Sequence, residues 1–147
     1  MNPTKAWCVT GGAGFIGSHL VEHLLSTGVG DLEVDRLLVI DALTYAGRRE
    51  NLDPLRNDSR LHFEHRDLAD EEAVLRLLEN HEIGGIFHLA AETHVDRSID
   101  NPDPFLQSNV VATGRLLSAT RRHWKNLGGP EQEAFRFLHV STDEVYG

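Results

Sequence analysis

The stretch that decides the fold is Thr10-Gly11-Gly12-Ala13-Gly14-Phe15-Ile16-Gly17. It lies between a short β-rich run, 6–10, and a segment, 15–27, whose apolar residues recur at helical spacing. Its glycines fit both G-x-G-x-x-G and G-x-x-G-x-x-G. Glycine permits a tight turn and a close approach of backbone to a pyrophosphate, which the N–H groups at a helix start can hold. The stretch therefore predicts a dinucleotide-binding turn; the alternative is a structural turn that holds no ligand.

The rest of the chain repeats this alternation of strand and helix. The predicted strands are 6–10, 37–40, 61–65, 86–89 and 135–140; the predicted helices are 15–27, one that follows Asp70, and one from about 104 to 124. Short apolar strands separated by helices indicate a doubly wound, Rossmann-type α/β fold with a parallel sheet. Right-handed crossovers predict the strand order 3-2-1-4-5.

Two of the predicted helices carry further signals. Asp70 is a candidate N-cap, and the apolar residues Ala73, Val74, Leu77 and Leu78 give its helix a buried side. The longest helix has apolar residues at helical spacing, and its apolar side, with Trp124, is expected to form either core or a dimer face. Those residues are Phe105, Val110, Val111, Leu116 and Leu117. The sequence Gly128-Gly129-Pro130 is expected to end it.

Composition excludes several classes of protein. The net charge of −9 argues against binding to nucleic acid or to a membrane surface, and the apolar runs are too short to span a bilayer. The single cysteine, Cys8, cannot form an internal disulfide, which fits a cytoplasmic protein. His19 and His23 match the zinc-protease pattern H-x-x-E-H, but no third ligand is evident, so no metal site is predicted.

Two aspartates follow predicted strands. Asp41 ends the second strand, where a carboxylate can accept both adenosine ribose hydroxyls and disfavour a 2′-phosphate, which selects NAD over NADP. The alternative for Asp41 is an ordinary aspartate that caps a turn. Asp67 follows the third strand and could reach the adenine edge or simply cap a helix.

Two other strand ends are rich in polar groups: 90–94 (Ala-Ala-Glu-Thr-His) and 141–144 (Ser-Thr-Asp-Glu). Ligands of open α/β sheets bind at the carboxyl ends of strands. Adjacent carboxylates there suit acid and base chemistry, in which one is a base and the other an acid. The alternative is a solvated acidic turn.

Four segments together resemble the dTDP-glucose 4,6-dehydratases of the extended short-chain dehydrogenase/reductase family. They are 10–17, 41–47 (Asp-Ala-Leu-Thr-Tyr-Ala-Gly), 88–99 and 141–147 (Ser-Thr-Asp-Glu-Val-Tyr-Gly), and they span the chain in order. The Thr-Asp-Glu of the last segment distinguishes this group from UDP-galactose 4-epimerases, which lack the acid pair, and from relatives with Thr-Ser-Glu. Another nucleotide-sugar epimerase or decarboxylase, or a non-catalytic NAD-binding fragment, stays as an alternative.

The resemblance implies a cofactor, NAD, and a substrate, dTDP-glucose, which the enzyme oxidises at C4, dehydrates across C5 and C6 and reduces at C6. Glu144 would be the base at C5, Asp143 the acid for the C6 hydroxyl, and Thr142 a hydrogen-bond partner of the sugar. The implied substrate-binding residues are Thr93, Thr142, Asp143 and Glu144. The implied cofactor-binding residues are Gly11, Gly14, Phe15, Ile16, Gly17, Asp41, Leu43, Thr44, Asp67, Leu68, Leu89, Ala90, Ala91, Thr93 and Ser108.

The family's Tyr-x-x-x-Lys pair is not found, and Tyr146 is not followed by such a lysine. We therefore expect residues 1–147 to be an NAD-binding domain without its C-terminal substrate domain, and to be inactive alone. The family also pairs through the helix at 104–124, which implies a homodimer in the full-length enzyme.

Overall fold

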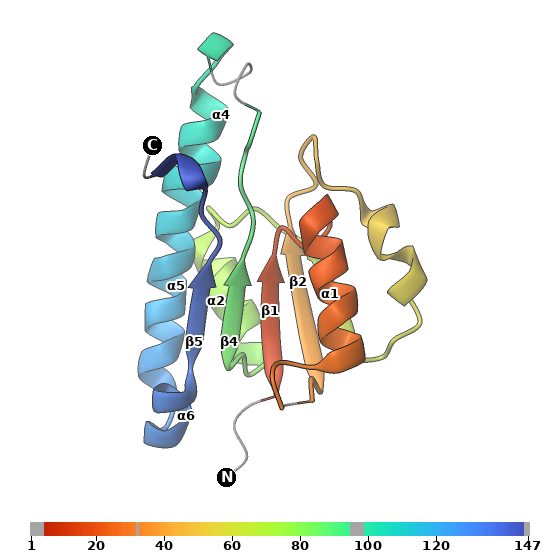
Figure 1. Ribbon diagram of the computed structural model, residues 1–147. Coiled ribbons are helices and arrows are strands. Elements are labelled where there is room, and N and C mark those ends of the chain that lie inside the picture. Colours follow the sequence, from red (N-terminus) through yellow and green to blue (C-terminus); the bar gives the residue numbers. More distant parts are fainter. Residues whose placement is uncertain (1–4, 32, 95–98, 146–147) are drawn as a thin grey trace.

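The computed structural model describes residues 5–31, 33–94 and 99–145 (Figure 1). One sheet runs through its centre, with strands in the order β3-β2-β1-β4-β5, and every neighbouring pair is parallel. The strands are β1 Ala6–Thr10, β2 Arg36–Asp41, β3 Leu61–His65, β4 Gly85–His88 and β5 Arg136–His139. The predicted strand order and the Rossmann-type fold are confirmed.

Helices cover both faces of the sheet (Figure 1). Helix α1, Phe15–Thr27, and the 3₁₀ segment η1, Arg49–Leu55, lie on one face. Helices α2, Glu71–Asn80, and α5, Thr113–Asn126, lie on the other. Short helices complete the chain: α4 Asp103–Phe105, the π-helix η2 Leu106–Ala112, α6 Gly129–Ala134 and η3 Asp143–Val145.

The alternation of side chains along β1 divides the core in two. Trp7 and Val9 belong to an apolar cluster with Val21 and Leu24 of α1, whereas Cys8 belongs to the cluster of α2 and α5. Successive side chains of a strand point to opposite faces, so a strand covered on both faces must be apolar throughout. All five residues of β1 are buried, which is why this strand lies at the centre of the sheet.

Helix α2 begins as expected, because Asp70 caps it: its Oδ1 accepts a hydrogen bond from Ala73 N at 3.1 Å. Its buried side differs by one residue from the prediction. Leu75 is buried and Leu77 is only partly buried. The stripe is rotated because α2 packs against α5 as well as against the sheet.

The long helix lies where it was predicted, but its π-helical segment was not predicted. It begins at Asp103, passes through the π-helical segment η2, and continues as α5 to Asn126. Leu116 is buried, but Val110, Val111 and Leu117 are exposed. A π-helix bonds i to i+5, so each wide turn shifts the phase of the following residues, and a strict 3.6-residue period no longer marks one face. Helix α5 ends at Asn126, just before the glycines at 128 and 129 as expected, and α6 begins at Gly129.

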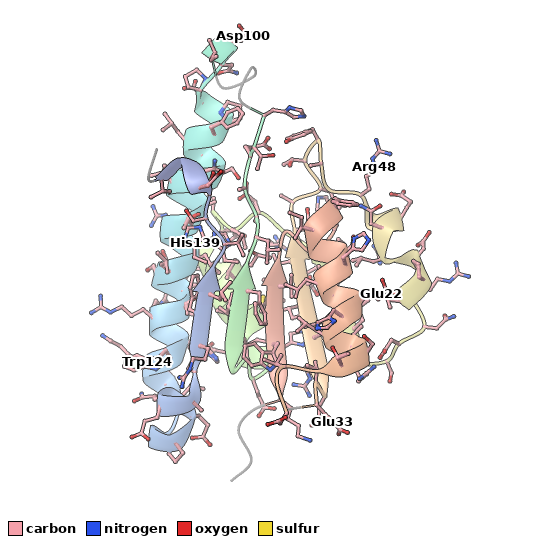
Figure 2. The ribbon with its side chains drawn as sticks, viewed as in Figure 1. Glu22, Glu33, Arg48, Asp100, Trp124 and His139 are labelled. Atoms are coloured by element: carbon pink, nitrogen blue, oxygen red, sulfur yellow. The ribbon has the colours of Figure 1, made fainter. Side chains whose placement is uncertain are left out.

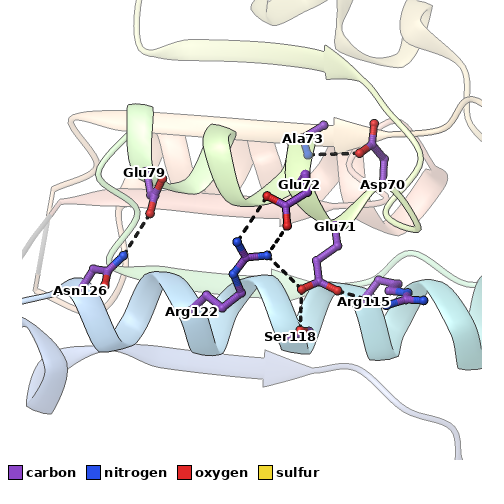
Figure 3. A network of polar contacts seen from close by, with 9 residues as sticks. All are labelled: Asp70, Glu71, Glu72, Ala73, Glu79, Arg115, Ser118, Arg122 and Asn126. Carbon is purple, nitrogen blue, oxygen red and sulfur yellow. Dashed lines mark hydrogen bonds and ion pairs between the residues drawn. The ribbon is translucent and has the colours of Figure 1, made fainter.

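A polar network joins α2 to α5 (Figure 3). Glu71 accepts hydrogen bonds from Ser118 Oγ at 2.6 Å, Arg122 Nη1 at 3.2 Å and Arg115 Nη1 at 3.3 Å, and Arg122 also pairs with Glu72. These bonds, led by that of Ser118, hold the pKa of Glu71 below its ordinary value. The network fixes α5, and with it the η2 segment that reaches the candidate site.

Candidate active site

The candidate site lies along the carboxyl edge of the sheet. Because all five strands are parallel, the turn after β1, Asp41 at the end of β2, residues 89–94 after β4 and residues 141–143 after β5 share one edge (Figure 1). The structure thus brings the glycine turn and the polar strand ends to the same side of the molecule, as ligand binding in an open α/β sheet requires.

The glycine turn is closed by two approaches that no side chain would tolerate. Gly11 has a φ of +71°, and a Cβ there would lie 2.7 Å from Ala90 N. A Cβ on Gly17 would lie 2.1 Å from Gly11 O. The first glycine therefore seats the turn against the strand end after β4, and the second seats α1 against the turn. Close packing of the backbone is therefore enough to explain why two of the predicted cofactor residues, Gly11 and Gly17, are glycines.

The start of α1 offers free donors to an anion. The N-cap is Gly14, which makes no side-chain capping bond, and no acidic residue occupies the first turn of α1, all of which the structure describes. The first N–H groups of a helix have no intrahelical acceptor, and the helix dipole is positive there. Phe15 and Ile16 flank this end with 78% and 67% of their surface exposed. The arrangement fits a pyrophosphate.

Asp41 is buried beside the turn, and both of its carboxylate oxygens accept backbone hydrogen bonds. Oδ2 accepts from Ala13 N at 2.9 Å and Oδ1 from Leu43 N at 2.8 Å. The turn-capping role considered for Asp41 is therefore present. Each oxygen has a second lone pair, so a ribose hydroxyl can still donate to Asp41. Leu43, at a φ of 51°, bends the chain around this carboxylate, and Thr44 follows it on the surface.

Asp67 and Leu68 have different surroundings. Asp67 is exposed, and its Oδ1 accepts from Ala69 N at 2.8 Å in the turn that leads to α2, whereas Asp70 is the residue that caps this helix. Leu68 is buried in the apolar core with Val74 and Leu78. Both residues follow β3 and therefore lie at the β3 end of the carboxyl edge of the sheet.

The segment after β4 is held to η2. Asn109 Nδ2 donates to Glu92 O at 2.9 Å, and Glu92 N donates to Asn109 Oδ1 at 2.8 Å. This reciprocal pair holds the backbone at Glu92, between Ala91 and Thr93, against the η2 helix, which also carries Ser108.

Beneath this segment, His88 joins three elements of the fold. Its Nδ1 lies 2.6 Å from Thr10 Oγ1, and its Nε2 lies 3.0 Å from Thr113 Oγ1 of α5. Burial, helped by the nearby ring of His139 (labelled in Figure 2), lowers the pKa of His88 to about 4, so the ring is neutral at pH 7. One ring nitrogen is then a donor and the other an acceptor, which matches two hydroxyl partners.

The strand end after β5 carries the acid pair. Thr142 and Asp143 are exposed, and Thr142 Oγ1 donates to Asp143 Oδ1 at 3.3 Å. Glu144 lies in the short helix η3, and its side chain falls outside the described part of the structure. The backbone places these residues at the same edge as the glycine turn (Figure 1).

Sequence reasoning missed Thr10, Tyr45, His88, Asn109 and Thr113, which support the site from behind or beside it. The signal for His88 was present, since a histidine inside an apolar strand must find partners when it is buried. Nothing in the sequence pairs it with Thr113, because the two are joined only by the packing of α5 on the sheet.

The zinc-like pattern has local partners: His19 Nδ1 contacts Phe15 O at 2.8 Å, and His23 Nε2 contacts Thr27 Oγ1 at 3.1 Å. Within the described ranges, no three His, Cys, Asp or Glu residues gather in a way that could hold a metal ion. The same ranges contain no helix with the length and apolarity needed to cross a membrane.

Comparison with known proteins agrees with this geometry. Residues 8–147 match the family model described as GDP-mannose 4,6 dehydratase. The chain belongs to this family. It is 48% identical over 141 residues to a dTDP-glucose 4,6-dehydratase of Xanthomonas campestris pv. campestris (strain B100). The alignment takes in 96% of the chain but only 38% of that relative.

Solved structures give the same result for this dehydratase-family chain. DesIV, a dTDP-glucose 4,6-dehydratase from Streptomyces venezuelae solved with NAD and TYD bound, superposes with a TM-score of 0.84 at 44% identity over 97% of this chain and 41% of that one. The UDP-glucose 4-epimerase of Thermotoga maritima, solved with UDP-glucose, has a TM-score of 0.72 at 31% identity over 93% of this chain and 38% of that one. The resemblance expected from the four sequence segments is confirmed.

Proposed function

We propose that the complete enzyme containing this chain binds NAD and converts dTDP-glucose to dTDP-4-keto-6-deoxyglucose. The observation that carries the proposal is the shared sheet edge on which the glycine turn and the Thr142-Asp143-Glu144 segment both lie. Two further facts support it: Gly11 and Gly17 allow the close backbone packing that forms the turn at the start of α1, and the similar relatives include proteins named dTDP-glucose 4,6-dehydratase.

The dinucleotide would lie along the carboxyl edge. The N–H groups at the start of α1, with Gly11, Gly14, Phe15, Ile16 and Gly17 around them, would hold its pyrophosphate. The adenosine side would lie on Asp41, Leu43, Thr44, Asp67 and Leu68. The nicotinamide side would lie against Leu89, Ala90, Ala91, Thr93 and Ser108. When bound, NAD supplies an acceptor for the hydrogen of C4 and returns it at C6.

The chemistry assigned to the chain is proton transfer. Oxidation of C4 to a ketone acidifies the proton on C5, which Glu144 would remove as general base. Asp143 would protonate the C6 hydroxyl as it leaves as water, and Thr142 would hydrogen-bond the sugar. The two carboxyl groups need opposite protonation states, and adjacent positions on one short helix let them act on neighbouring carbons.

Product analysis of the complete enzyme tests the proposal. Incubation with dTDP-glucose and NAD should give a 4-keto-6-deoxy sugar, seen as loss of water by mass spectrometry and as a ketone by NMR. Recovery of the C4 epimer would instead favour an epimerase, the function of the Thermotoga maritima neighbour. A complete protein that binds NAD but changes neither sugar would be a non-catalytic module.

The oligomeric state and location of the enzyme are part of the same proposal. The exposed apolar residues Leu106, Val110, Leu117 and Trp124 on the long helix support a homodimer that pairs through it. A single buried cysteine and a net charge of −9 support a cytoplasmic enzyme with no nucleic-acid or membrane partner. Sedimentation of the complete enzyme and of a Leu117→Lys variant tests the pairing.

A further inference from the structure

The segments after β2 and β4 meet above the turn after β1. In the sheet, β1 lies between β2 and β4, so the two segments leave on opposite sides of the glycine turn (Figure 1). Tyr45, from the β2 side, places its hydroxyl 3.2 Å from Thr93 Oγ1 on the β4 side. Its ring also lies against the His94 ring, with centroids 4.9 Å apart and planes at 46°.

Each side of this contact is anchored independently. On the β2 side, Asp41 Oδ1 holds Leu43 N, and Gly47 packs so closely that a Cβ there would lie 2.6 Å from that oxygen. On the β4 side, the reciprocal bonds between Asn109 and Glu92 hold the backbone one residue before Thr93. Tyr45 therefore connects two walls, the segments 42–47 after β2 and 89–94 after β4, each of which is held in place by other contacts.

Space is available for the bridge to open. Tyr45 also lines an open cavity of about 440 Å³, whose other lining residues are Glu92, Asp100, Asn101, Pro104 and Phe105. Tyr45 is 37% exposed and lies outside the two buried apolar clusters. Opening the bridge breaks at least the hydroxyl–hydroxyl bond to Thr93 and the ring contact with His94.

We propose that Tyr45 is a positioning residue that closes the groove between the segments after β2 and β4, above the glycine turn, over a bound dinucleotide. By closing this groove, Tyr45 slows release of the dinucleotide. The inference rests on the proposed function. In an internal oxidation and reduction, the same dinucleotide must stay from the first step to the last, because its loss between them strands a 4-keto intermediate. The contacts of Tyr45 with Thr93 and His94, which form a tie across the groove, would hold the dinucleotide in place between the two steps.

The test is the rate of dinucleotide release from the complete enzyme. NADH fluorescence is followed in a stopped-flow instrument after mixing with excess NAD, for wild type, Tyr45→Phe, Thr93→Val and the double variant. One hydrogen bond contributes about 0.5–1.5 kcal/mol, so Tyr45→Phe should speed release roughly 2- to 10-fold. The double variant should release no faster than Thr93→Val, because the hydroxyl pair is already broken.

The matched control removes a hydroxyl elsewhere. Thr27→Val, at the far end of α1, deletes the bond of Thr27 to His23 O and should leave the release rate at the wild-type value. Additive effects of Tyr45→Phe and Thr93→Val, or a wild-type rate in Tyr45→Phe, overturn the proposal.

A second measurement needs no dinucleotide. Amide hydrogen exchange of the complete, cofactor-free enzyme should accelerate in Tyr45→Phe at residues 42–47 and also at 89–94, across the groove. Acceleration confined to 42–47 would show that Tyr45 does not restrain the opposite wall, and would overturn the tie. If wild-type enzyme binds no NAD, the proposed function fails and retention with it; if it binds NAD and only the variant rates are unaltered, the tie alone is wrong.

Discussion

The hydroxyl of Thr10 lies 2.6 Å from Nδ1 of His88, a contact between the last residues of two neighbouring strands. Thr10 begins the glycine turn, and His88 precedes the segment that carries Thr93. Thr10 Oγ1 also accepts from Ala90 N at 3.4 Å. The glycine turn after β1 is thus joined to the segment after β4, and this join depends on a neutral histidine.

Acid should destabilise the fold through His88. Its pKa is about 4 in the folded protein and about 6.5 when unfolded, so the unfolded chain binds the extra proton. The stability that the neutral ring contributes is full above pH 6.5 and is lost as pH falls toward 4, a total of about 3 kcal/mol. Urea unfolding at pH 7.5, 5.5 and 4.5 measures this loss.

A variant separates His88 from other groups. Burial also lowers the pKa of His81, which loses stability in the same direction, whereas the lowered pKa values of Glu71 and Glu72 act only below their ordinary 4.5. His88→Gln should be less stable at pH 7.5 and should flatten the slope between pH 7.5 and 4.5. An NMR titration midpoint of His88 near 6.5 would contradict the mechanism.

Gly17→Ala should damage both the fold and the site. Its Cβ would lie 2.1 Å from Gly11 O, a backbone atom that cannot move without opening the turn. We expect a loss of about 1–3 kcal/mol in unfolding free energy and at least roughly tenfold weaker NAD binding, measured by urea titration and calorimetry. Gly114→Ala in α5 is the control: nothing lies within 4 Å of its Cβ, so stability should rise by roughly 0.5–1 kcal/mol with unaltered NAD affinity.

Asp41→Ala should weaken NAD binding and also loosen the turn. It leaves the N–H groups of Ala13 and Leu43 without their carboxylate, at a cost of about 1–3 kcal/mol in stability. Asp67→Ala serves as the comparison, because the bond that its side chain accepts from Ala69 N is exposed and should matter less to stability. NAD affinity equal to wild type in Asp41→Ala, at a temperature where the variant is folded, would refute the ribose contact.

Glu144→Gln should stop exchange of the C5 proton with solvent in the complete enzyme, because the amide is no longer a base. Product formation should fall by roughly 10²-fold or more, while NAD affinity stays within about twofold. Incubation in D₂O with NMR detection of deuterium at C5 measures the exchange. Exchange at the wild-type rate would clear Glu144 of this role.

The sheet was predictable because its signals are local. Short apolar strands, the glycines around the turn and the capping Asp70 each act over a few residues, and a parallel connection permits one handedness. Which residues of the long helix face the core was not predictable. The π-helical segment at 106–112 depends on tertiary contacts, including the Asn109 bonds to Glu92, that the sequence does not reveal.

The candidate site divides in the same way. Gly11, Gly17 and Asp41 could be singled out from the sequence because few residue types can take their places: only glycine fits the close backbone packing, and a short carboxylate accepts the backbone N–H bonds of the turn. Tyr45 could not, and neither could the partner of His88 on α5, since Thr93 lies 48 positions from Tyr45 and Thr113 lies 25 positions from His88, and these pairs meet only when loops and helices pack. The role of Asp67 was open from sequence, and its exposed turn contact explains why pattern alone did not decide it.

Cys8, the only cysteine of the chain, is wholly enclosed in β1, and burial raises the pKa of its thiol far above the ordinary value. Cys8 should therefore not react with thiol-alkylating reagents in the folded chain, whereas in the unfolded chain it is alkylated once. Mass spectrometry of alkylated samples then counts opened molecules directly, and surface cysteines introduced for dyes can be labelled selectively without first removing the native one.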